Sequence, residues 1–582
     1  MEVEAVDPGP SHSVKRSLDT RSDTNCELDG SAKKGRLKRT VKIAVAGCSH
    51  GEMDKIYACI DEIQKSKGFS VDLLICTGDY QAVRNSGDLE YMQTPPKYRN
   101  LQTFHRYYSG EAIAPVLTLV IGGNHESSGY MQELPYGGWL APKIYYLGHA
   151  SVVSYAGLRI GGLSGIYKSI HYDMGHFERP PFSQYGDLVS VYHVRSVDVF
   201  RLKQLEPKPD DKCKHTRDSQ LYYFFFQNLK KLDIMVSHDW PSGITDYGDV
   251  EALLRIKPHF ADDIKKAALG NPATMNLLHV LRPRYWFSSH LHCAFIALVP
   301  HEAAPDDESP EFTRFLALDK PIPGRRFLQA NIFFPIFYLI WPSLARHAWS
   351  KLILRILDVE TDNDVDKVLR YDPVWLTILR LTDKFTSASN RKSYMPSSYP
   401  PSDERWDYRP SEDEVTEVIK LFNNNLDIPE DFVRTAPPEK VFSTSNRTSE
   451  CYYRNPQTSK FCEKLGVQDL NGMLCASSPD DVGTPYFLSE TQDICKNESE
   501  SLNEQAVDTI TSDGCFFIDK EPQRTSGDKQ SLAADLKLHE AGKTEASLSD
   551  QNGEEPADTV GSECELVNKV GCDAESEVAE NT

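Results

Sequence analysis

Residues 42–51 read KIAVAGCSHG, and the two halves of this stretch have different characters. The first half, Ile43 to Ala46, is an unbroken apolar run that predicts a short buried strand, and Gly47 ends it. The second half places a thiol, Cys48, and an imidazole, His50, in the loop that follows. Loops at strand ends carry a large share of the catalytic and ligand groups of proteins. The stretch therefore predicts a strand that delivers two candidate metal ligands.

The same pattern, an apolar run that ends in polar or ionisable residues, occurs four more times. The runs lie in VDLLICTGDY, APVLTLVIGGNHE, DIMVSHDWP and RYWFSSHLH. The residues that close them are Asp79, Asn124, His125, His238, His290 and His292. Between KIAVAGCSHG and VDLLICTGDY, residues 52–67 carry apolar side chains at helical spacing, which predicts a helix. Strands that alternate with helices predict a layered α/β domain.

Strand ends in a layered α/β domain meet at one edge of the sheet, where ligands bind. A single histidine there is more often structural, but five strand ends of this kind indicate a common site. Imidazole and carboxylate ligands together suit zinc, iron or manganese, and a thiolate at Cys48 favours zinc or ferrous iron over magnesium. The alternative for Cys48 is a buried, inert thiol that only packs.

The order C-x-H, G-D, G-N-H-E, H, H-x-H resembles the pattern of the calcineurin-like metallophosphoesterases, which begins with D-x-H. The stretches AVAGCSHGEMDKIY, CTGDYQAVRN, GGNHES, GGWLAPKIYYLG and GLSGIYK resemble, more closely, the RNA lariat debranching family within that superfamily. The resemblance covers residues 41–329 and 356–468. It implies an α/β (α+β) fold, in which a β-sandwich is flanked by helices and carries the metals at one edge.

The resemblance also implies a role for each residue of the pattern. Two metal sites would share Asp79: Asn124, His238 and His290 would complete one, and Cys48, His50 and His292 the other. Cys48 stands where most of the superfamily has Asp, and the debranching family is expected to have Cys there. His125 would be the general acid that protonates the leaving oxygen. One or two divalent metals, Fe²⁺, Zn²⁺ or Mn²⁺, would bind per chain.

The activity that the resemblance implies is hydrolysis of the 2′–5′ phosphodiester bond at the branch point of excised intron lariat RNA, which gives linear RNA for turnover. The expected partners are the branched RNA and splicing or intron-turnover proteins, with no membrane. Two alternatives stay open: a general metallophosphatase of the same superfamily, and a catalytically weak RNA-binding isoform. The stretch GGWLAPKIYYLG favours debranching over the first alternative.

Selectivity for RNA is expected from residues 127–148, a loop-like stretch rich in aromatic residues. An aromatic side chain that stacks on an unpaired base contributes roughly 1–3 kcal/mol. The candidates are Tyr130, Tyr136, Trp139, Tyr145 and Tyr146 for base stacking, and Lys143, Lys168 and Arg84 for phosphate contacts. Ordinary core packing explains any single one of these aromatic residues equally well.

Four segments are predicted along the chain. They are a disordered leader (1–40), a calcineurin-like metallophosphoesterase domain (41–300), a debranching-family C-terminal domain (301–468) and a disordered acidic tail (469–582). Residues 480–582 contain 25 Asp and Glu against 7 Lys and Arg, so they carry −18 of the total net charge of −21. The folded part is therefore close to neutral, and its charge does not argue against a polyanionic substrate. The polar composition of the tail predicts disorder.

One segment departs from the family pattern. In the family, RRFLQ would run almost directly into ILDVE, whereas here 26 residues, Ala330 to Arg355, lie between them. The unbroken apolar part, Ile332 to Trp341, is too short to span a bilayer, which takes about 20 residues. We interpret the segment as an insertion within a strand that forms no part of the core.

The 13 cysteines include no C-x-x-C pair, which argues against a disulfide framework and a cysteine-rich zinc module. A reducing intracellular compartment is therefore expected. The basic cluster KKGRLKR, Lys33 to Arg39, suits a nuclear import receptor, although a solvated run of charge is an equal alternative. We expect the nucleus as the location, with shuttling to the cytoplasm as an alternative.

Overall fold

The computed structural model describes residues 39–180, 182, 185–206, 232–302, 312–322, 325–329, 357–361, 366–397, 405–442 and 453–475. Three predicted segments lie outside these residues: residues 1–38 of the leader, Ala330–Arg355, and residues 476–582 of the tail. Both ends of the folded part extend further than predicted. The first strand begins at Arg39, and the helix Leu470–Cys475 packs Leu470 and Leu474 into the protein.

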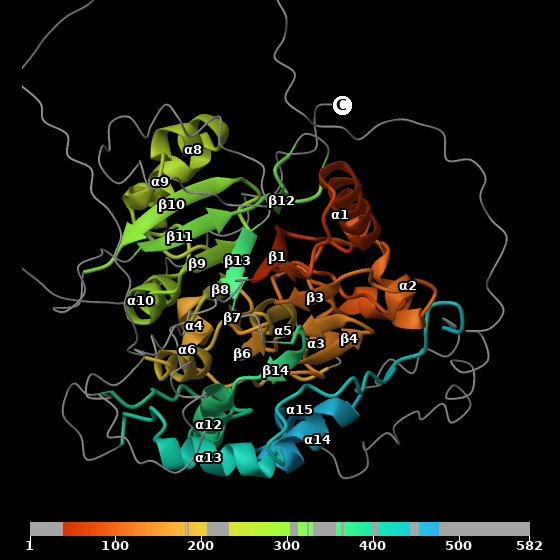
Figure 1. Cartoon of the computed structure of the whole chain (residues 1–582), viewed down its shortest axis with the longest axis vertical. Helices are drawn as coiled ribbons and strands as arrows, with labels where there is room; N and C mark the ends of the chain where they lie inside the picture. The colour runs from red at the N-terminus through yellow and green to blue at the C-terminus, as the bar shows by residue number, and fades with distance from the viewer. Residues whose placement is uncertain are drawn as a thin grey trace, which may run out of the picture. The chain divides into compact units, whose positions relative to one another are not determined.

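Two sheets form the centre of the described structure (Figure 1). The first contains, in order, β12 (Leu328–Gln329), β1 (Arg39–Ala46), β2 (Leu73–Cys76), β3 (Leu117–Val120), β5 (Ile144–Tyr146) and β4 (Gly138–Ala141), with β13 (Leu357–Thr361) also paired to β1. The second contains β10 (Phe295–Pro300), β11 (Phe312–Ala317), β9 (Tyr285–Ser288), β8 (Ile234–Ser237), β7 (Leu158–Leu163), β6 (Ala150–Tyr155) and β14 (Leu369–Tyr371). The predicted mixed α/β fold is confirmed.

The described helices are mostly short. They are α1 (Met53–Lys67), α2 (Phe104–Ser109), α3 (Ser128–Met131), α4 (Ser169–Tyr172), α5 (Tyr185–Ser190), α6 (Ser196–Lys203), α8 (Val250–Ile256), α9 (Ala261–Lys265), α10 (Pro272–Leu281), α12 (Pro373–Leu381), α13 (Glu412–Leu421), α14 (Pro456–Leu465) and α15 (Leu470–Cys475). The predicted helix after the first strand is confirmed as α1, which buries Ile56 and Ile60 and ends at Gly68 with a left-handed φ of 70°. Among the described helices, none has the length and apolar character needed to cross a membrane.

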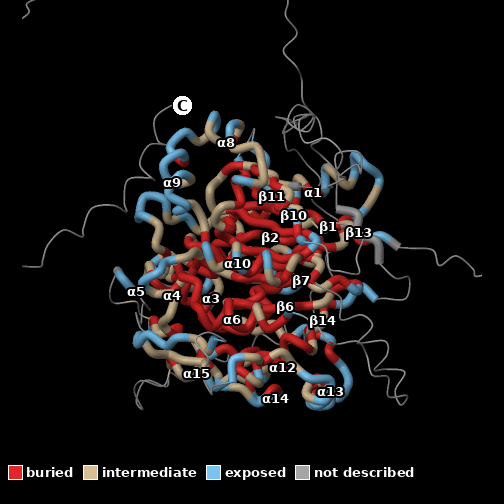
Figure 2. The backbone as a smooth tube through the Cα atoms, turned by 90° about the vertical axis from the view of Figure 1, so that its left-hand side faces the viewer, coloured by how far each residue is buried: buried red, intermediate tan, exposed pale blue. Residues whose placement is uncertain are grey.

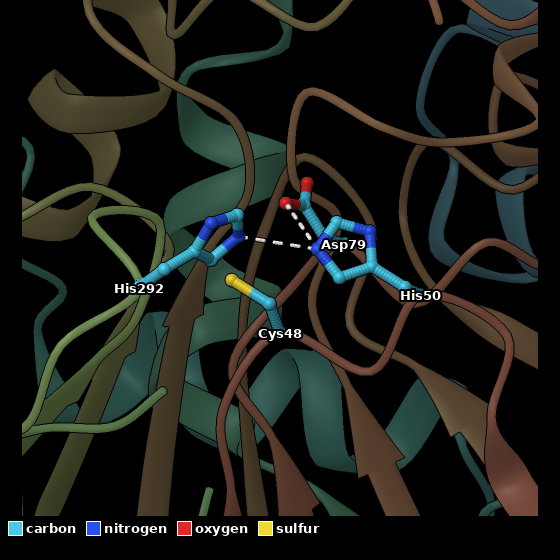
Figure 3. A group of neighbouring side chains, drawn as sticks. All are labelled: Cys48, His50, Asp79 and His292. Atoms are coloured by element: carbon cyan, nitrogen blue, oxygen red, sulfur yellow. Dashed lines mark hydrogen bonds and ion pairs between the residues drawn. The ribbon is translucent and has the colours of Figure 1, made fainter. Parts of the chain in front are cut away.

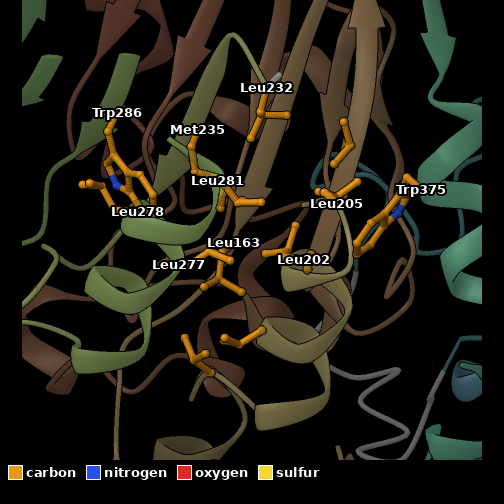
Figure 4. Close-up of a cluster of buried hydrophobic side chains, with 14 of the residues drawn as sticks. Leu163, Leu202, Leu205, Leu232, Met235, Leu277, Leu278, Leu281, Trp286 and Trp375 are labelled. Atoms are coloured by element: carbon orange, nitrogen blue, oxygen red, sulfur yellow. The ribbon is translucent and has the colours of Figure 1, made fainter. Parts of the chain in front are cut away.

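The core lies in three layers around the two sheets, because successive side chains of a strand point to opposite faces. Between the sheets lie Ile43, Leu73 and Leu119 of the first sheet, with Ile160, Val236 and Phe287 of the second. The outer face of the first sheet packs against α1 and α2. The outer face of the second packs against α6, α10 and α12, where one buried cluster contains Leu202, Leu277 and Trp375 together with Met235 and Trp286 (Figure 4). Figure 2 shows this buried interior with exposed residues around it.

Strands from the part of the chain beyond residue 310 complete both sheets. β11 lies between β9 and β10, β14 pairs with β6, and β12 and β13 pair with β1. The C-terminal part therefore shares its hydrogen-bonded ladders with the part that precedes it, and does not form a sheet of its own among the described residues.

The register of β12 and β13 on β1 shows where the ladder is interrupted. Val45 of β1 pairs with Gln329, and Ile43 pairs with Leu357. Between these two pairs β1 advances by two residues while the residue number of its antiparallel partner changes by 28, which is 26 more than a continuous strand would give. This number equals the length of Ala330–Arg355, so the register agrees with an insertion within one strand.

Deletion of Ala330–Arg355, which joins Gln329 to Ile356, is expected to preserve the fold and to raise the free energy of unfolding by up to about 3 kcal/mol. Closing a flexible loop of n residues costs roughly (3/2)RT ln n, which is about 3 kcal/mol at this length. Urea denaturation of the parent and the deletion variant measures the difference. A longer deletion, residues 330–361, removes β13 as well and is expected to destabilise the protein. Failure of the shorter deletion variant to fold would contradict the prediction.

Candidate metal centre

The predicted metal ligands follow the carboxyl ends of parallel strands. β1, β2, β3 and β5 are parallel neighbours in the first sheet, as are β7, β8, β9 and β11 in the second. The strands and the residues that follow them are β1 with Cys48 and His50, β2 with Asp79, β3 with Asn124, β8 with His238, and β9 with His290 and His292. The two edges touch, because the N–H of His290 donates to Sγ of Cys48 at 3.2 Å.

Cys48, His50, Asp79 and His292 form a compact cluster in which the four side chains point toward one another (Figure 3). Their ligand atoms all lie within 4.8 Å of one another. Nε2 of His50 is 3.2 Å from Nε2 of His292 and 3.8 Å from Oδ2 of Asp79. Two imidazoles, a carboxylate and a thiol at this spacing fit one divalent metal of the zinc or ferrous type.

The second predicted set meets the first at Asp79. Nε2 of His238 lies 3.1 Å from Oδ1 of Asp79 and 3.2 Å from Oδ1 of Asn124. The ring centroids of His238 and His290 are 5.0 Å apart. One oxygen of Asp79 therefore faces each set, which is the arrangement of a bridging carboxylate.

The carboxylate of Asp79 has the properties of a group that holds a cation. Its Oδ2 is buried and receives no hydrogen bond from any described residue, a state that is costly unless a cation compensates it. Burial alone would raise the pKa of Asp79, but His238, His125 and His50 outweigh burial and hold this pKa well below its ordinary range. The carboxylate is therefore ionised at neutral pH.

Three imidazoles of the two sets are in the protonation state that a metal needs, and the thiol is not. Burial lowers the pKa of His50 to about 4, of His290 to about 3 and of His292 to about 2, so each imidazole is neutral at pH 7 and offers a lone pair. Burial raises the pKa of the Cys48 thiol well above its ordinary value. Coordination to a metal deprotonates a thiol, so metal binding at Cys48 would release a proton.

Four of these residues are held in the left-handed region of backbone space. The φ angles are 46° at His50, 44° at Asp79, 57° at His290 and 47° at His292. Side chains other than glycine adopt this region uncommonly, at a cost of roughly 1–3 kcal/mol each, and such strain collects at functional sites. The fold therefore sets the direction of these side chains against a local backbone preference.

Glycines allow the loops of the site to approach one another. A Cβ atom at Gly123 would lie 2.2 Å from Oδ1 of Asp79, and one at Gly78 would lie 2.2 Å from Nδ1 of His238. Neither contact is sterically allowed, so both positions require glycine. The site has a closed side and an open side: Cys48, Asp79, Asn124 and His238 are buried, whereas His50, His125, His290 and His292 are only half-buried.

Comparison with known proteins matches both parts of the chain. The family model described as calcineurin-like phosphoesterase matches residues 41–294, and the model described as lariat debranching enzyme, C-terminal domain, matches residues 310–470. The chain is 46% identical over 489 residues to the lariat debranching enzyme of Caenorhabditis elegans, covering 83% of this chain and 88% of that protein. It is 42% identical over 470 residues to the lariat debranching enzyme of Homo sapiens, covering 81% of this chain and 77% of that protein.

The chain belongs to the lariat debranching enzyme family. It is thus an enzyme of the calcineurin-like phosphoesterase class, and the match to the first family model ends just beyond His292, the last residue of the metal pattern.

In this member of the debranching family, His125 lies beside the ligand sets. Its backbone N–H donates to Oδ1 of Asp79 at 2.9 Å, and its Nδ1 is 3.0 Å from Oγ1 of Thr94. Its ring centroid is 5.5 Å from that of His50. The imidazole is therefore fixed on the open side of the cluster, where a substrate would reach it.

The aromatic residues predicted to stack on RNA bases belong to the core. Tyr130, Tyr136, Trp139, Tyr145 and Tyr146 are between 0% and 7% exposed. The hydroxyl of Tyr130 donates to the carbonyl of Leu140, and Nε1 of Trp139 donates to the carbonyl of Pro429. No face of these rings is open to a base, so the structure corrects this prediction: the aromatic residues of β4, β5 and α3 stabilise the fold.

The predicted phosphate contacts have three different surroundings. Arg84 is 2% exposed and pairs with Asp88 at 2.9 Å and Glu133 at 2.7 Å, so its charge is used inside the protein and the prediction is corrected. Lys143 is exposed, but it precedes β5 and so lies at the end of that strand remote from the ligands, which argues against a phosphate contact there. Lys168 is exposed and follows the carboxyl end of β7, on the edge of the site.

Glu126 is a residue of the site whose role the sequence reasoning missed. Its carboxylate accepts hydrogen bonds from the N–H groups of Tyr80 at 2.7 Å, Gln81 at 2.8 Å and Gly123 at 2.9 Å. It thereby ties the loop after β2, which carries Asp79, to the loop after β3. Burial raises the pKa of Glu126 to about 7. The sequence does contain a signal for this role: Glu126 is an acidic residue that follows directly after a buried strand, at the end of GGNHE.

Proposed function

We propose that this chain hydrolyses the 2′–5′ phosphodiester bond at the branch point of intron lariat RNA, in a reaction that depends on a divalent metal. The observation that carries the proposal is the pair of ligand sets that share Asp79, in a chain of the lariat debranching enzyme family. Fe²⁺ and Zn²⁺ suit the set that includes the thiolate, and Mn²⁺ is a further candidate for the set of imidazole, carboxylate and amide ligands.

The residues of the site would have two roles in phosphodiester hydrolysis, metal binding and proton donation. Cys48, His50 and His292 would hold one metal and Asn124, His238 and His290 a second, with Asp79 between the two. A divalent metal supplies Lewis-acid activation of the phosphate and of water. The strained backbone and the close glycines already fix the directions of the ligand side chains. These side chains therefore need little rearrangement during the reaction. His125, held by Asp79 and Thr94, donates a proton to the leaving ribose oxygen.

The test compares three substrates on the metal-loaded chain. Branched 2′–5′ RNA is expected to be cleaved at the branch, while linear 3′–5′ RNA of the same sequence stays largely intact. A phosphomonoester is the third substrate, and removal of the metal with a chelator is expected to abolish cleavage. Equal rates on both RNAs, or a preference for the phosphomonoester, would overturn the substrate assignment and leave the family membership in place.

We also propose that the protein acts in the nucleus, together with splicing or intron-turnover proteins. The support is the basic cluster Lys33–Arg39, which lies almost entirely outside the described residues. A fluorescent fusion in which Lys33, Lys34 and Arg36 are replaced by alanine is expected to lose nuclear accumulation. Unchanged nuclear accumulation would show that the cluster is not the import signal.

A further inference from the structure

The loop that follows β11 reaches the same edge as the metal ligands. β11 is parallel to β9, and its register pairs Ala317 with Ser288. The N–H of Leu318 donates to the carbonyl oxygen of Ser288 at 3.0 Å, which continues the ladder by one step. Lys320 follows two residues after this last ladder bond, beyond the strand end that adjoins the loop of His290 and His292.

The first sheet holds this loop from the other side. The N–H of Gly47 donates to the carbonyl oxygen of Phe327 at 2.8 Å, and a Cβ atom at Gly47 would lie 2.0 Å from the carbonyl oxygen of Asp319. Gly47 immediately precedes Cys48. Lys320 is therefore fixed between the strand ends that carry the two halves of the first ligand set.

The charge of Lys320 is available to a ligand. The side chain is half-buried and forms no ion pair with any described residue, whereas Arg325 of the same loop pairs with Asp319 at 3.4 Å. The positive charge of Lys320 contributes to the lowered pKa of both His50 and His292, as expected of an ammonium group near the open side of the cluster. An ammonium group beside a site for divalent cations is repelled unless an anion lies between them.

The geometry points to Lys320 as a residue that binds the phosphate of the substrate, together with the Cys48, His50, Asp79 and His292 set. A lysine is a compact point charge on a flexible stem, which suits a non-bridging phosphate oxygen. The inference rests on the proposed function and deepens it. It also assigns to the C-terminal family segment, residues 310–470, a direct part in the active site.

The main test compares Lys320→Ala with the parent, both as metal-loaded full chains acting on branched RNA. The substitution is expected to lower kcat/KM by about 10- to 100-fold, and to reduce the magnitude of the salt dependence of log(kcat/KM) by about one unit. Metal content is expected to stay unchanged, and Lys320→Arg is expected to restore most of the lost activity. The control is Lys65→Ala, which removes one positive charge from the last turn of α1, where the side chain is 75% exposed.

A second probe makes the inference independent of the RNA assignment. Inorganic phosphate is used as an inhibitor of hydrolysis of bis(4-nitrophenyl) phosphate, and its inhibition constant is expected to rise about 10-fold in Lys320→Ala. If this shift occurs and branched RNA is not cleaved, the phosphate contact holds and the 2′–5′ assignment fails. If Lys320→Ala matches Lys65→Ala in kcat/KM, salt dependence and phosphate inhibition, or loses metal in proportion to rate, the inference is overturned.

Discussion

Replacement of His125 by alanine is expected to lower the rate of branched-RNA cleavage by about 10²- to 10⁴-fold and to leave the bound metal in place, because loss of a general acid has an effect of this size. The backbone N–H of His125 donates to Oδ1 of Asp79, and the substitution keeps this hydrogen bond. Single-turnover rates and metal analysis of the same preparations measure the two quantities separately.

The control for this variant is His259→Ala, since His259 is an exposed histidine remote from the ligand pattern in the sequence. It is expected to keep the rate of the parent. Loss of metal from His125→Ala in proportion to its loss of rate would show that His125 is a ligand and would contradict the role of proton donor.

Asp79→Asn is expected to lower the rate by about 10³-fold or more and to remove metal from both sets. The substitution keeps the volume of the side chain but removes the charge that both sets share. Lewis-acid activation contributes several kcal/mol, and each 1.36 kcal/mol corresponds to about a tenfold change in rate. Stability of the metal-free protein supplies a second readout: because His238, His125 and His50 hold the pKa of Asp79 well below its ordinary range, the ionised carboxylate stabilises the metal-free fold, and metal-free Asp79→Asn is expected to be less stable than the metal-free parent at neutral pH.

Cys48→Ala is the matched comparison, since Cys48 belongs to one set only. It is expected to reduce metal binding by that set and to spare the set of Asn124, His238 and His290. Equal metal loss in Asp79→Asn and Cys48→Ala would contradict a bridging Asp79. A Cys48→Ala variant with the metal content and rate of the parent would show that the thiol only packs.

The arrangement of the metal ligands could be predicted from the sequence because local pattern and fold agree there. Each short apolar run forms a buried strand, and parallel strands bring their carboxyl ends to one edge whatever lies between them in the chain. The ligand candidates, from Cys48 to His292, therefore come together at one edge. The helix after the first strand was equally predictable, because its apolar residues repeat at helical spacing.

The surroundings of the aromatic residues could not be predicted, because burial of residues 127–148 depends on distant segments. The backbone N–H of Trp139 donates to Gln457, and the hydroxyl of Tyr136 donates to the carbonyl of Gln468, both more than 300 residues along the chain. Within the stretch itself, an aromatic run that covers a core and one that binds a base look the same. The role of the residues after β11 was not predicted for another reason. LALDK also ends an apolar run, but its last residue is the cationic Lys320, whereas the other runs end in candidate metal ligands.

The position of β11 within the second sheet determines when, during synthesis of the chain, the sheets can be completed. The last ligand, His292, precedes the end of β14 at Tyr371 by 79 residues, and β11 separates β9 from β10 in the sheet. At about 5–20 residues per second, a ribosome takes roughly 4–16 s to cover this distance. During that time the nascent chain already contains every candidate metal ligand but lacks the strands that complete both sheets. We therefore expect the candidate metal centre to be complete only late in synthesis.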